Sequence, residues 1–442
     1  MIKEDGKVVV IGLGYVGLPL AMVLAEVGFE VCGVDVREEV IAATRAGEPL
    51  FHEPGLAPRL KRVVERGHLQ VYGVHPHDFD ADVFIVTVGT PLGDDGRVRL
   101  DMICHAAHEI ASRIKPGNLV ILRSTVKLHT TRQVIKPILD KAGVPYDLAF
   151  CPERTIEGQA LVELHSLPQI VAGDSLEAAL RATRFFMHLT PTVVRVSTIE
   201  TAEMIKLIDN TQRDLIFAFA NEIAAMCDGA GVRAAEVIRA GKLGYPRTNL
   251  PLPGPVGGPC LSKDTYILVE SLAGTGVIPK ISLAGRSRNE AQPEEIAGFV
   301  SRYLSKRGIN ENACVSLLGI AFKGRPPTDD LRGTMARPIL DRMRGHLPGA
   351  TFLGFDMMVS TSEIKKFGLH PVPDLAAAFA NAHLVIILNN HPAFELMPLE
   401  SLAATMARPG LIYDCWNLFN PGDFELPEGV AYVGLGGHAA VG

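Results

Sequence analysis

The sequence predicts an α/β protein with two doubly wound parallel sheets joined by a long central helix. Three observations support this fold class. Short β-branched runs alternate with helical patterns in both halves of the chain, a glycine-rich turn follows the first run, and one helical pattern extends from Ile199 to about Gly229. The 442 residues are enough for two or three domains.

Composition argues against several function classes. The formal net charge of −6 gives no indication of a nucleic-acid partner. The seven cysteines are scattered without zinc-ligand spacing, so we expect neither disulfides nor a metal site, and the chain suits a reducing cytoplasm. Three glycines and a proline interrupt the uncharged run from Val8 to Ala25, which predicts a strand, a turn and a helix in place of a membrane span or a signal peptide.

The turn after the first predicted strand carries Gly12, Gly14 and Gly17. In a dinucleotide fingerprint the first glycine makes a tight turn, the second admits the pyrophosphate and the third lets helix and strand pack closely. Asp35 lies near the expected distance for a ribose-hydroxyl acceptor, which favours NAD, although Arg37 could meet a 2′-phosphate of NADP. The alternative is a glycine-rich turn without a ligand.

Polar residues stand at the ends of several predicted strands. In open α/β sheets ligands bind beyond the carboxyl ends of strands, so Thr90, Ser124, Thr125 and Glu153 are candidates to line a nicotinamide pocket. Ser124 and Thr125 could instead cap the next helix. The predicted strands are Lys7–Ile11, Phe29–Asp35, Ala81–Gly89, Asn118–Thr125, Pro145–Glu153, Ala313–Phe322, Thr351–Asp356, Ala382–Asn390 and Gly410–Asn417.

The long central helix carries one polar stripe on an otherwise apolar surface. Its members recur at steps of three or four residues and are Glu203, Lys206, Asn210, Arg213 and Asp214. The stripe faces a ligand, a partner or solvent. In the first case Lys206 and Asn210 reach an active site from a rigid support.

A cysteine follows the turn-forming stretch Pro253–Pro259, whose glycines let the backbone approach a ligand closely. If a helix begins at Ser262, Cys260 lies near its N-terminus, where the helix dipole favours a thiolate. Asp264 then lies on the same face as the sulfur. The alternative is a buried structural cysteine.

Two other segments suit anionic ligands. Arg247, with Tyr245 and Asn249 nearby, could bind a phosphate or a carboxylate, or could be a surface arginine. The charged loop Lys323–Arg332 follows the first strand of the second sheet and suits a diphosphate, although such a loop is often only solvated.

Seven motifs follow one another along nearly the whole chain. They are GLGYVGLPLA at Gly12–Ala21, VGTP at Val88–Pro91, RSTV at Arg123–Val126, CPERTIEGQAL at Cys151–Leu161, AEMIKLIDN at Ala202–Asn210, GGPCLSKD at Gly257–Asp264 and LGIAFKG at Leu318–Gly324. Together they resemble the family of four-electron nucleotide-sugar 6-dehydrogenases, which includes the UDP-glucose and UDP-N-acetylmannosamine dehydrogenases. The resemblance implies an NAD-binding Rossmann domain at 1–196, a central helical dimerisation region at 197–305 and a UDP-binding α/β domain at 306–442.

The residues and the resemblance together give a set of expected roles in a cytoplasmic homodimer that acts on a UDP-sugar and serves polysaccharide biosynthesis. The catalytic set is Cys260 as nucleophile, Asp264 as base, Lys206 and Asn210 as stabilisers of negative charge, and Glu153 with Thr125 for the hydrolytic water. The NAD contacts are Gly12, Gly14, Tyr15, Val16, Gly17, Asp35, Arg37, Thr90, Ser124, Thr125 and Lys263. The substrate contacts are Arg154, Lys206, Asn210, Arg213, Tyr245, Arg247, Asn249, Gly257, Lys323 and Arg332.

The Arg213–Asp214 pair resembles the branch that acts on UDP-N-acetylhexosamines, UDP-N-acetyl-D-mannosamine above all, with UDP-glucose and UDP-N-acetylglucosamine as alternatives. The runs Asn389–His391 and Phe355–Met357 depart from the family's usual pattern in the UDP-binding domain.

Two rivals from other classes remain. One is a two-electron NAD dehydrogenase of hydroxyacid type, which needs neither Cys260 nor a second α/β domain. The other is a non-catalytic NAD-binding regulator, which leaves the polar stripe without a purpose.

Overall fold

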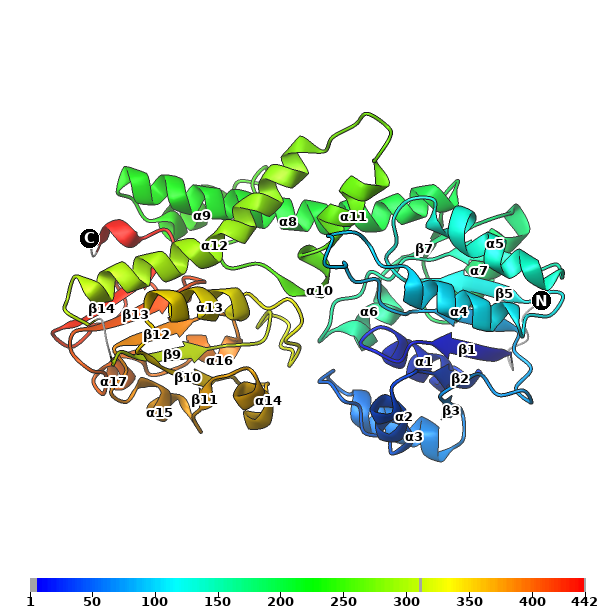
Figure 1. Cartoon of the computed structure of the whole chain (residues 1–442), viewed down its shortest axis with the longest axis horizontal. Helices are drawn as coiled ribbons and strands as arrows, with labels where there is room; N and C mark the ends of the chain where they lie inside the picture. The colour runs from blue at the N-terminus through cyan, green and yellow to red at the C-terminus, as the bar shows by residue number, and fades with distance from the viewer. Residues whose placement is uncertain (1–5, 310–311, 441–442) are drawn as a thin grey trace. The chain divides into compact units, whose positions relative to one another are not determined.

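The computed structural model describes residues 6–309 and 312–440. Contacts divide it into two compact units. The first unit contains the chain up to Asp209 and the segment Lys263–Ile278, and the second contains Asn210–Ser262 and the chain from Pro279 onward. Helix α8 (Ile199–Ala230), labelled in Figure 1, begins in the first unit and ends in the second. The three-part domain division expected from the resemblance remains a prediction.

The described strands of the first unit form one sheet in the order β3-β2-β1-β4-β5-β6-β7-β8. Neighbouring strands run parallel except β6 and β7, which are antiparallel. The strands are β1 (Lys7–Ile11), β2 (Glu30–Val34), β3 (Leu69–Tyr72), β4 (Val83–Val86), β5 (Leu119–Leu122), β6 (Asp147–Phe150), β7 (Gln169–Gly173) and β8 (Val193–Arg195). The helices are α1 (Gly17–Glu26), α2 (Glu38–Arg45), α3 (Leu56–Glu65), α4 (Asp101–Ala111), the π-helical turn Thr131–Ile135, α5 (Lys136–Leu139), the 3-10 turn Asp140–Ala142, α6 (Ala160–Ser166), α7 (Leu176–Phe186) and α11 (Asp264–Ser271).

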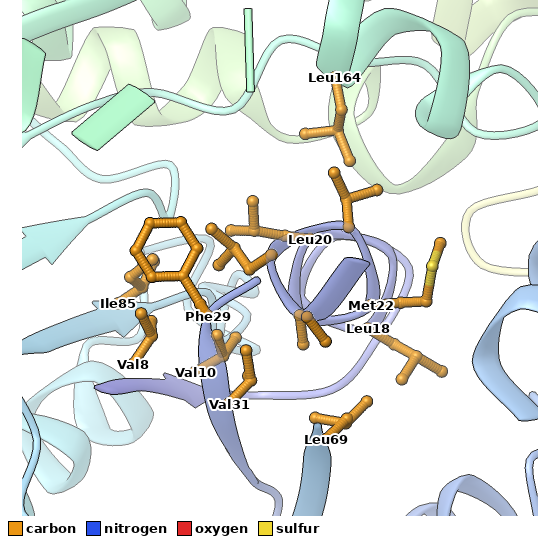
Figure 2. Close-up of a cluster of buried hydrophobic side chains, with 14 of the residues drawn as sticks. Val8, Val10, Leu18, Leu20, Met22, Phe29, Val31, Leu69, Ile85 and Leu164 are labelled. Atoms are coloured by element: carbon orange, nitrogen blue, oxygen red, sulfur yellow. The ribbon is translucent and has the colours of Figure 1, made fainter. Parts of the chain in front are cut away.

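The apolar strand runs of the first unit are buried on both faces of the sheet. Val8 and Val10 of β1 belong to one core with α1 and α7, whereas Val9 and Ile11 belong to a second core with α4. Figure 2 shows the first core, in which side chains from β1 to β4 gather around α1 together with Leu164 of α6. Burial on both faces explains why these strands read as continuous apolar runs.

The described strands of the second unit form an all-parallel sheet in the order β11-β10-β9-β12-β13-β14. Leu384 and Ile386 of β12 pack toward α12 and α13, and Val385 and Ile387 pack toward α15 and α17. The strands are β9 (Cys314–Leu318), β10 (Thr351–Phe355), β11 (His370–Pro371), β12 (Leu384–Ile387), β13 (Gly410–Asp414) and β14 (Val430–Gly434). The helices are α9 (Ala234–Lys242), α10 (Gly258–Leu261), α12 (Lys280–Ser305), α13 (Ala336–His346), α14 (Thr361–Lys366), α15 (Leu375–Phe379), α16 (Pro392–Glu395), α17 (Leu399–Ala403) and the 3-10 turn His438–Ala440.

The predicted fold class is confirmed, because both sheets wind outward from a central strand in the same order and α8 is a single helix of 32 residues. The run Val8–Ala25 is the strand, turn and helix that the sequence predicts. In the part of the chain that the structure describes, none of the helices combines the length and the apolar character that crossing a bilayer requires.

One carboxylate in each unit fastens the turn after the central strand. Asp35, directly after β2, accepts a 2.8 Å hydrogen bond from the Leu13 N–H. Asp356, directly after β10, accepts hydrogen bonds of 2.6 Å and 3.0 Å from the N–H groups of Ile320 and Ala321. The second unit therefore repeats a structural feature of the first, with Gly319 (φ 79°) directly after its central strand, but without the three-glycine spacing of the first turn.

Asp356→Asn is expected to destabilise the second unit. Besides the two N–H groups above, those of Met358 and Val359 donate to the Asp356 carboxylate. An amide would turn an NH₂ group toward buried donors, which costs about 1–3 kcal/mol. Thermal unfolding measures this loss, and the exposed Asp341→Asn, the control, should change stability by less than about 0.5 kcal/mol. Equal stability of the two variants would contradict the expectation.

Candidate active site

The turn after β1 has the shape that a dinucleotide pyrophosphate requires. Gly12 has a φ of 94°, and a Cβ on Gly17 would lie 1.8 Å from the Gly12 carbonyl oxygen. A Cβ on Gly14 would meet nothing within 4 Å, so this glycine borders open space. The N-terminus of α1 lies at this turn, where the helix dipole favours an anion, and among the described residues no side chain caps it. The residues present therefore fit NAD.

The side chains around this turn are held in place by local contacts. The Asp35 carboxylate accepts a 2.9 Å hydrogen bond from the Arg37 N–H and forms a 3.4 Å ion pair with the Arg37 side chain. Tyr15 stacks on Phe51 with ring centroids 4.2 Å apart, and Val16 is the residue before α1. Because Asp35 already engages Arg37, the pair reduces the positive charge that a 2′-phosphate would need.

Hydroxyl groups tie together the carboxyl ends of β4 and β5. The Ser124 Oγ donates to the Val88 carbonyl at 2.6 Å, and the Thr90 Oγ1 donates to the Thr125 carbonyl. The alternative that Ser124 and Thr125 cap a helix is wrong, because the next helical segment begins at Thr131. The strand-end residues lie together at the edge where the ligand is expected.

A fully buried ion pair lies at the carboxyl end of β6. The Arg123 guanidinium donates to Glu153 Oε2 and, at 3.1 Å, to the Gln169 side chain. Its charge also lies 4.9 Å from the centre of the Phe186 ring. The other oxygen of Glu153 accepts the N–H of Arg154 at 2.7 Å, so this carboxylate orders the chain that follows it.

The environment keeps Glu153 ionised. Burial by itself raises its pKa, but the Arg123 guanidinium, the Thr155 N–H and the charge of Lys206 together bring the pKa below its usual value. Lys206 is 9% exposed, so a buried ammonium lies near a buried carboxylate. Arg154 forms a 3.2 Å ion pair with Asp209.

The polar stripe of α8 is mostly buried, so the solvated interpretation is wrong for it, except at the exposed Arg213. Glu203 accepts N–H groups of His129 and Thr131 at 2.7 Å and 3.0 Å, which makes it a structural anchor. Burial, the largest influence, raises the pKa of Glu203. Asn210 is 7% exposed and is the first residue of the second unit.

Cys260 lies in the short helix α10 and is exposed, so the alternative of a buried cysteine is wrong. The expected helix from Ser262 is also wrong, because Lys263 leaves helical geometry with φ −125° and ψ −31° and α11 begins at Asp264. The spacing argument that placed Asp264 on the face of the sulfur therefore does not apply. Asp264 is fully buried, and the Lys263 Nζ donates to it at 2.7 Å.

The glycines before Cys260 are required by close packing against other residues of the protein, because a larger side chain would overlap with them. We call residues 253–262 the cysteine loop. A Cβ on Gly254 would lie 2.8 Å from the Trp416 ring, and one on Gly258 would lie 2.5 Å from Phe322. A Cβ on Gly257 would lie 2.3 Å from a backbone oxygen. The loop is closely packed within the second unit, to which it belongs, and Cys260 lies near its end.

The other six thiols differ from Cys260. They are Cys32, Cys104, Cys151, Cys227, Cys314 and Cys415. Burial raises the pKa of each of them, to about 12 for Cys32 and Cys151. A raised pKa leaves little thiolate at neutral pH, so these thiols are poor nucleophiles.

The cationic groups expected to bind the substrate are mostly at the surface of the second unit. The Arg247 guanidinium lies 4.4 Å from the centre of the Tyr245 ring and donates to its hydroxyl at 3.0 Å. Both residues and Asn249 are exposed. Arg332 chelates Asp330 with hydrogen bonds of 3.0 Å and 2.7 Å, and Lys323 lies 5.3 Å from the ring centre of its neighbour Phe322.

Sequence reasoning missed two buried arginines. Arg123 offered a signal, because a charged residue directly after a buried strand needs a partner. Arg286 of α12 offered none, since it contacts the cysteine loop, which is distant in sequence. The catalytic and binding roles assigned to individual residues remain predictions.

Comparison with known proteins shows the family of the chain. Models of the UDP-glucose/GDP-mannose dehydrogenase family match residues 6–189 (NAD binding domain), 200–291 (central domain) and 316–421 (UDP binding domain). UDP-N-acetyl-D-mannosamine dehydrogenase of Methanococcus maripaludis is 33% identical over 88% of this chain and 87% of its own length.

Solved structures agree with the family models. The structure of UDP-D-ManNAc dehydrogenase from Pyrococcus horikoshii has a TM-score of 0.86 at 30% identity and covers 98% of this chain and 100% of its own. That of a UDP-glucose dehydrogenase from Pyrobaculum islandicum has a TM-score of 0.83 at 25% identity and covers 98% of each chain. The chain therefore belongs to the UDP-glucose/GDP-mannose dehydrogenase family and is an NAD-dependent nucleotide-sugar dehydrogenase.

Proposed function

We propose that the enzyme oxidises the C6 alcohol of a UDP-sugar to a carboxylate by a four-electron route through a cysteine thioester. The observation that carries this proposal is the exposure of Cys260, in contrast to six thiols whose pKa is raised by burial. An exposed thiol at the end of a packed loop is accessible to a carbonyl carbon, which a cysteine nucleophile attacks.

In the first oxidation the alcohol loses a proton and a hydride. NAD accepts the hydride from C6, and Asp264, directly or through a water, takes the proton. The Lys206 ammonium and the Asn210 amide donate hydrogen bonds to the oxygen on which negative charge develops. The position of Lys206 supports this role, because its side chain is buried and close enough to the anionic Glu153 to interact with that charge.

In the second oxidation Cys260 holds the aldehyde. Its sulfur adds to the carbonyl carbon while the carbonyl oxygen takes a proton, which gives a thiohemiacetal. The thiohemiacetal then loses its hydroxyl proton to solvent and a second hydride, which a bound NAD would accept, and becomes a thioester. Water then attacks the thioester and releases the carboxylate and the thiol. The lowered pKa makes Glu153 a weak base, so we assign it the orientation of this water by accepting a hydrogen bond, with Thr125 assisting.

The proposed substrate is UDP-N-acetyl-D-mannosamine. The names of the Methanococcus and Pyrococcus relatives and the Arg213–Asp214 pair support this sugar. UDP-glucose and UDP-N-acetylglucosamine are the alternatives. A two-electron hydroxyacid dehydrogenase is disfavoured, because it would leave the match to a UDP binding domain at residues 316–421 without a purpose.

We also propose that residues 1–196 bind NAD, that 197–305 form the contact of a homodimer, and that 306–442 bind UDP. The family models support the first and third assignments. Exposed apolar side chains on α8, Ile208, Phe219 and Met226, support the second.

A substrate panel tests the proposed function. UDP-glucose, UDP-N-acetylglucosamine and UDP-N-acetyl-D-mannosamine are each incubated with NAD and enzyme, and the absorbance of NADH is followed. We expect the highest kcat/KM with UDP-N-acetyl-D-mannosamine. Higher kcat/KM with another sugar would refute the substrate assignment, and no turnover with any of the three would refute the function.

Cys260→Ala is expected to abolish uronate formation and to leave the binding of NAD and UDP-sugar intact, because no other thiol replaces the nucleophile. Product analysis by mass spectrometry and calorimetric titration measure the two effects. Cys104→Ala, which removes a partly buried thiol, is the control and should retain activity. Uronate production by Cys260→Ala near the wild-type rate would dismiss Cys260 as the nucleophile.

Lys206→Ala is expected to lower kcat by about 10²–10³-fold, the usual effect of removing one oxyanion donor, in a protein that still folds. Steady-state kinetics give kcat, and circular dichroism reports folding. Lys136→Ala, at a partly exposed ion pair, is the control with normal kcat. An unfolded Lys206→Ala protein would void the catalytic interpretation.

Glu153→Gln is expected to cost about 3–5 kcal/mol at neutral pH, because it leaves the buried Arg123 without its anion. A lowered carboxyl pKa contributes stability above the unfolded value, and that stability is lost as the pH falls through the folded pKa. The difference in stability between wild type and variant should therefore become smaller as the pH falls below 4.5, the ordinary pKa of a glutamate carboxyl. Denaturant titrations from about pH 7 to about pH 3 measure it.

The exposed pair of Glu177 and Arg184 provides the control for this experiment. Glu177→Gln should change stability by less than about 1 kcal/mol at every pH. A pH-independent difference between wild type and Glu153→Gln would show that Glu153 is not held as a low-pKa anion.

A further inference from the structure

We propose that Arg286 is a positioning residue for Cys260. It acts through the backbone of the cysteine loop and does not touch the reacting atoms. This inference rests on the proposed nucleophilic role of Cys260. All the residues that carry it belong to the second unit.

The Arg286 guanidinium bridges the two halves of the cysteine loop. One nitrogen donates to the Leu261 carbonyl at 3.0 Å, and the other lies 3.4 Å from the Val256 carbonyl, to which it donates. Leu261 follows Cys260 directly and ends α10, so its carbonyl has no acceptor role within that helix. One side chain thus fixes the backbone on both sides of the thiol.

The guanidinium is itself held rigidly. Its Nη1 also donates to Asp214 of α8 at 2.7 Å, and both side chains are almost completely buried. The Asn289 amide donates to the same Asp214 oxygen at 2.8 Å. Burial of an ion pair with its own hydrogen-bond partner leaves few alternative arrangements.

A second buried contact anchors the start of the loop. The Asn221 side chain exchanges two hydrogen bonds with the backbone of Gly254, at 2.9 Å and 3.0 Å, and also donates to Asn289 at 2.9 Å. We call Arg286, Asp214, Asn289 and Asn221 the loop clamp. The clamp connects α8 and α12 to the cysteine loop at three points, Gly254, Val256 and Leu261.

The consequence concerns geometry at the thiol. The loop leads from buried residues to an exposed cysteine, so the course of the backbone contributes to where the sulfur lies. A displacement of about 1 Å at a reacting group can cost 10²-fold in rate. The clamp therefore provides the rigidity that attack of the sulfur on the aldehyde requires.

The test compares Arg286→Lys with Arg288→Lys. Lysine keeps the charge but cannot bridge two carbonyls and a carboxylate with a fixed fork. Arg288 is a matched control on α12, because it is largely buried and donates to Glu295 and to a backbone carbonyl, that of Asn221, at 2.9 Å. Among the described contacts it donates neither to the Asn221 side chain, which holds Gly254, nor to a carbonyl of residues 253–262. Asp214→Asn is a milder second variant that retains Arg286.

Hydrogen exchange followed by mass spectrometry measures how readily the backbone of the cysteine loop opens. In Arg286→Lys, peptides that cover residues 254–262 should exchange at least about tenfold faster, as expected for the loss of charge-assisted hydrogen bonds. Peptides from the first unit should be unchanged. Arg288→Lys should leave the loop at the wild-type rate, and Asp214→Asn should give an intermediate effect.

Kinetics with UDP-N-acetyl-D-mannosamine separate positioning from a merely structural role. We expect kcat to fall by about 10²-fold in Arg286→Lys, while the KM for NAD stays at the wild-type value. Wild-type exchange in the loop together with wild-type kcat would overturn the proposal. Global unfolding of both Arg286→Lys and Asp214→Asn would also overturn it, because the contacts would then support the helix pair as a whole.

The two proposals fail in different ways. If the wild-type enzyme forms no uronate, the proposed function is wrong, yet the exchange comparison still decides whether the clamp holds the loop. If Cys260→Ala is inactive and Arg286→Lys is fully active, the function stands and the positioning role is wrong.

Discussion

The burial of charge along helix α8 is the constraint on which the rest of the structure depends. The helix is apolar on most sides, yet Glu203, Lys206 and Asp214 lie in the interior. Buried charges require partners, so each of them fixes a neighbouring segment. Glu203 holds the turn around Thr131, Lys206 lies near Glu153, and Asp214 holds the arginine that grips the cysteine loop. A single element thus organises parts of both units.

Two buried carboxylates that lie beside arginines have pKa values shifted in opposite directions. Burial raises the pKa of Asp214, and the Arg286 guanidinium does not fully offset it. Burial also raises the pKa of Glu153, but Arg123, a backbone N–H and Lys206 together bring it below its usual value. The number of donors around each group decides the difference. As a result Glu153 remains an anion, which suits the water-orienting role that we propose for it.

Local sequence signals were sufficient for the glycine turn, the central strands and the long helix, since each depends on residues close together in the chain. The sequence analysis did not predict the partly exposed edge strands β3, β8, β11 and β14, nor the buried strand β7. The break in helical geometry at Lys263 was not predicted, because the segment SKDTYILVESLA has continuous helical propensity. The pairs Arg123–Glu153 and Arg286–Asp214 join residues far apart in sequence, and no spacing rule connects such partners. Hence the components of the site could be predicted, whereas the contacts that position them could not.

The most direct test of the central claim is the ratio of NADH formed to UDP-sugar consumed. Two hydride transfers through a covalent thioester predict a ratio of two, with uronate as the product and no accumulation of aldehyde. A ratio of one with an aldehyde or ketone as the product would contradict the claim, because the enzyme would then stop after a two-electron oxidation and Cys260 would have no carbonyl to hold.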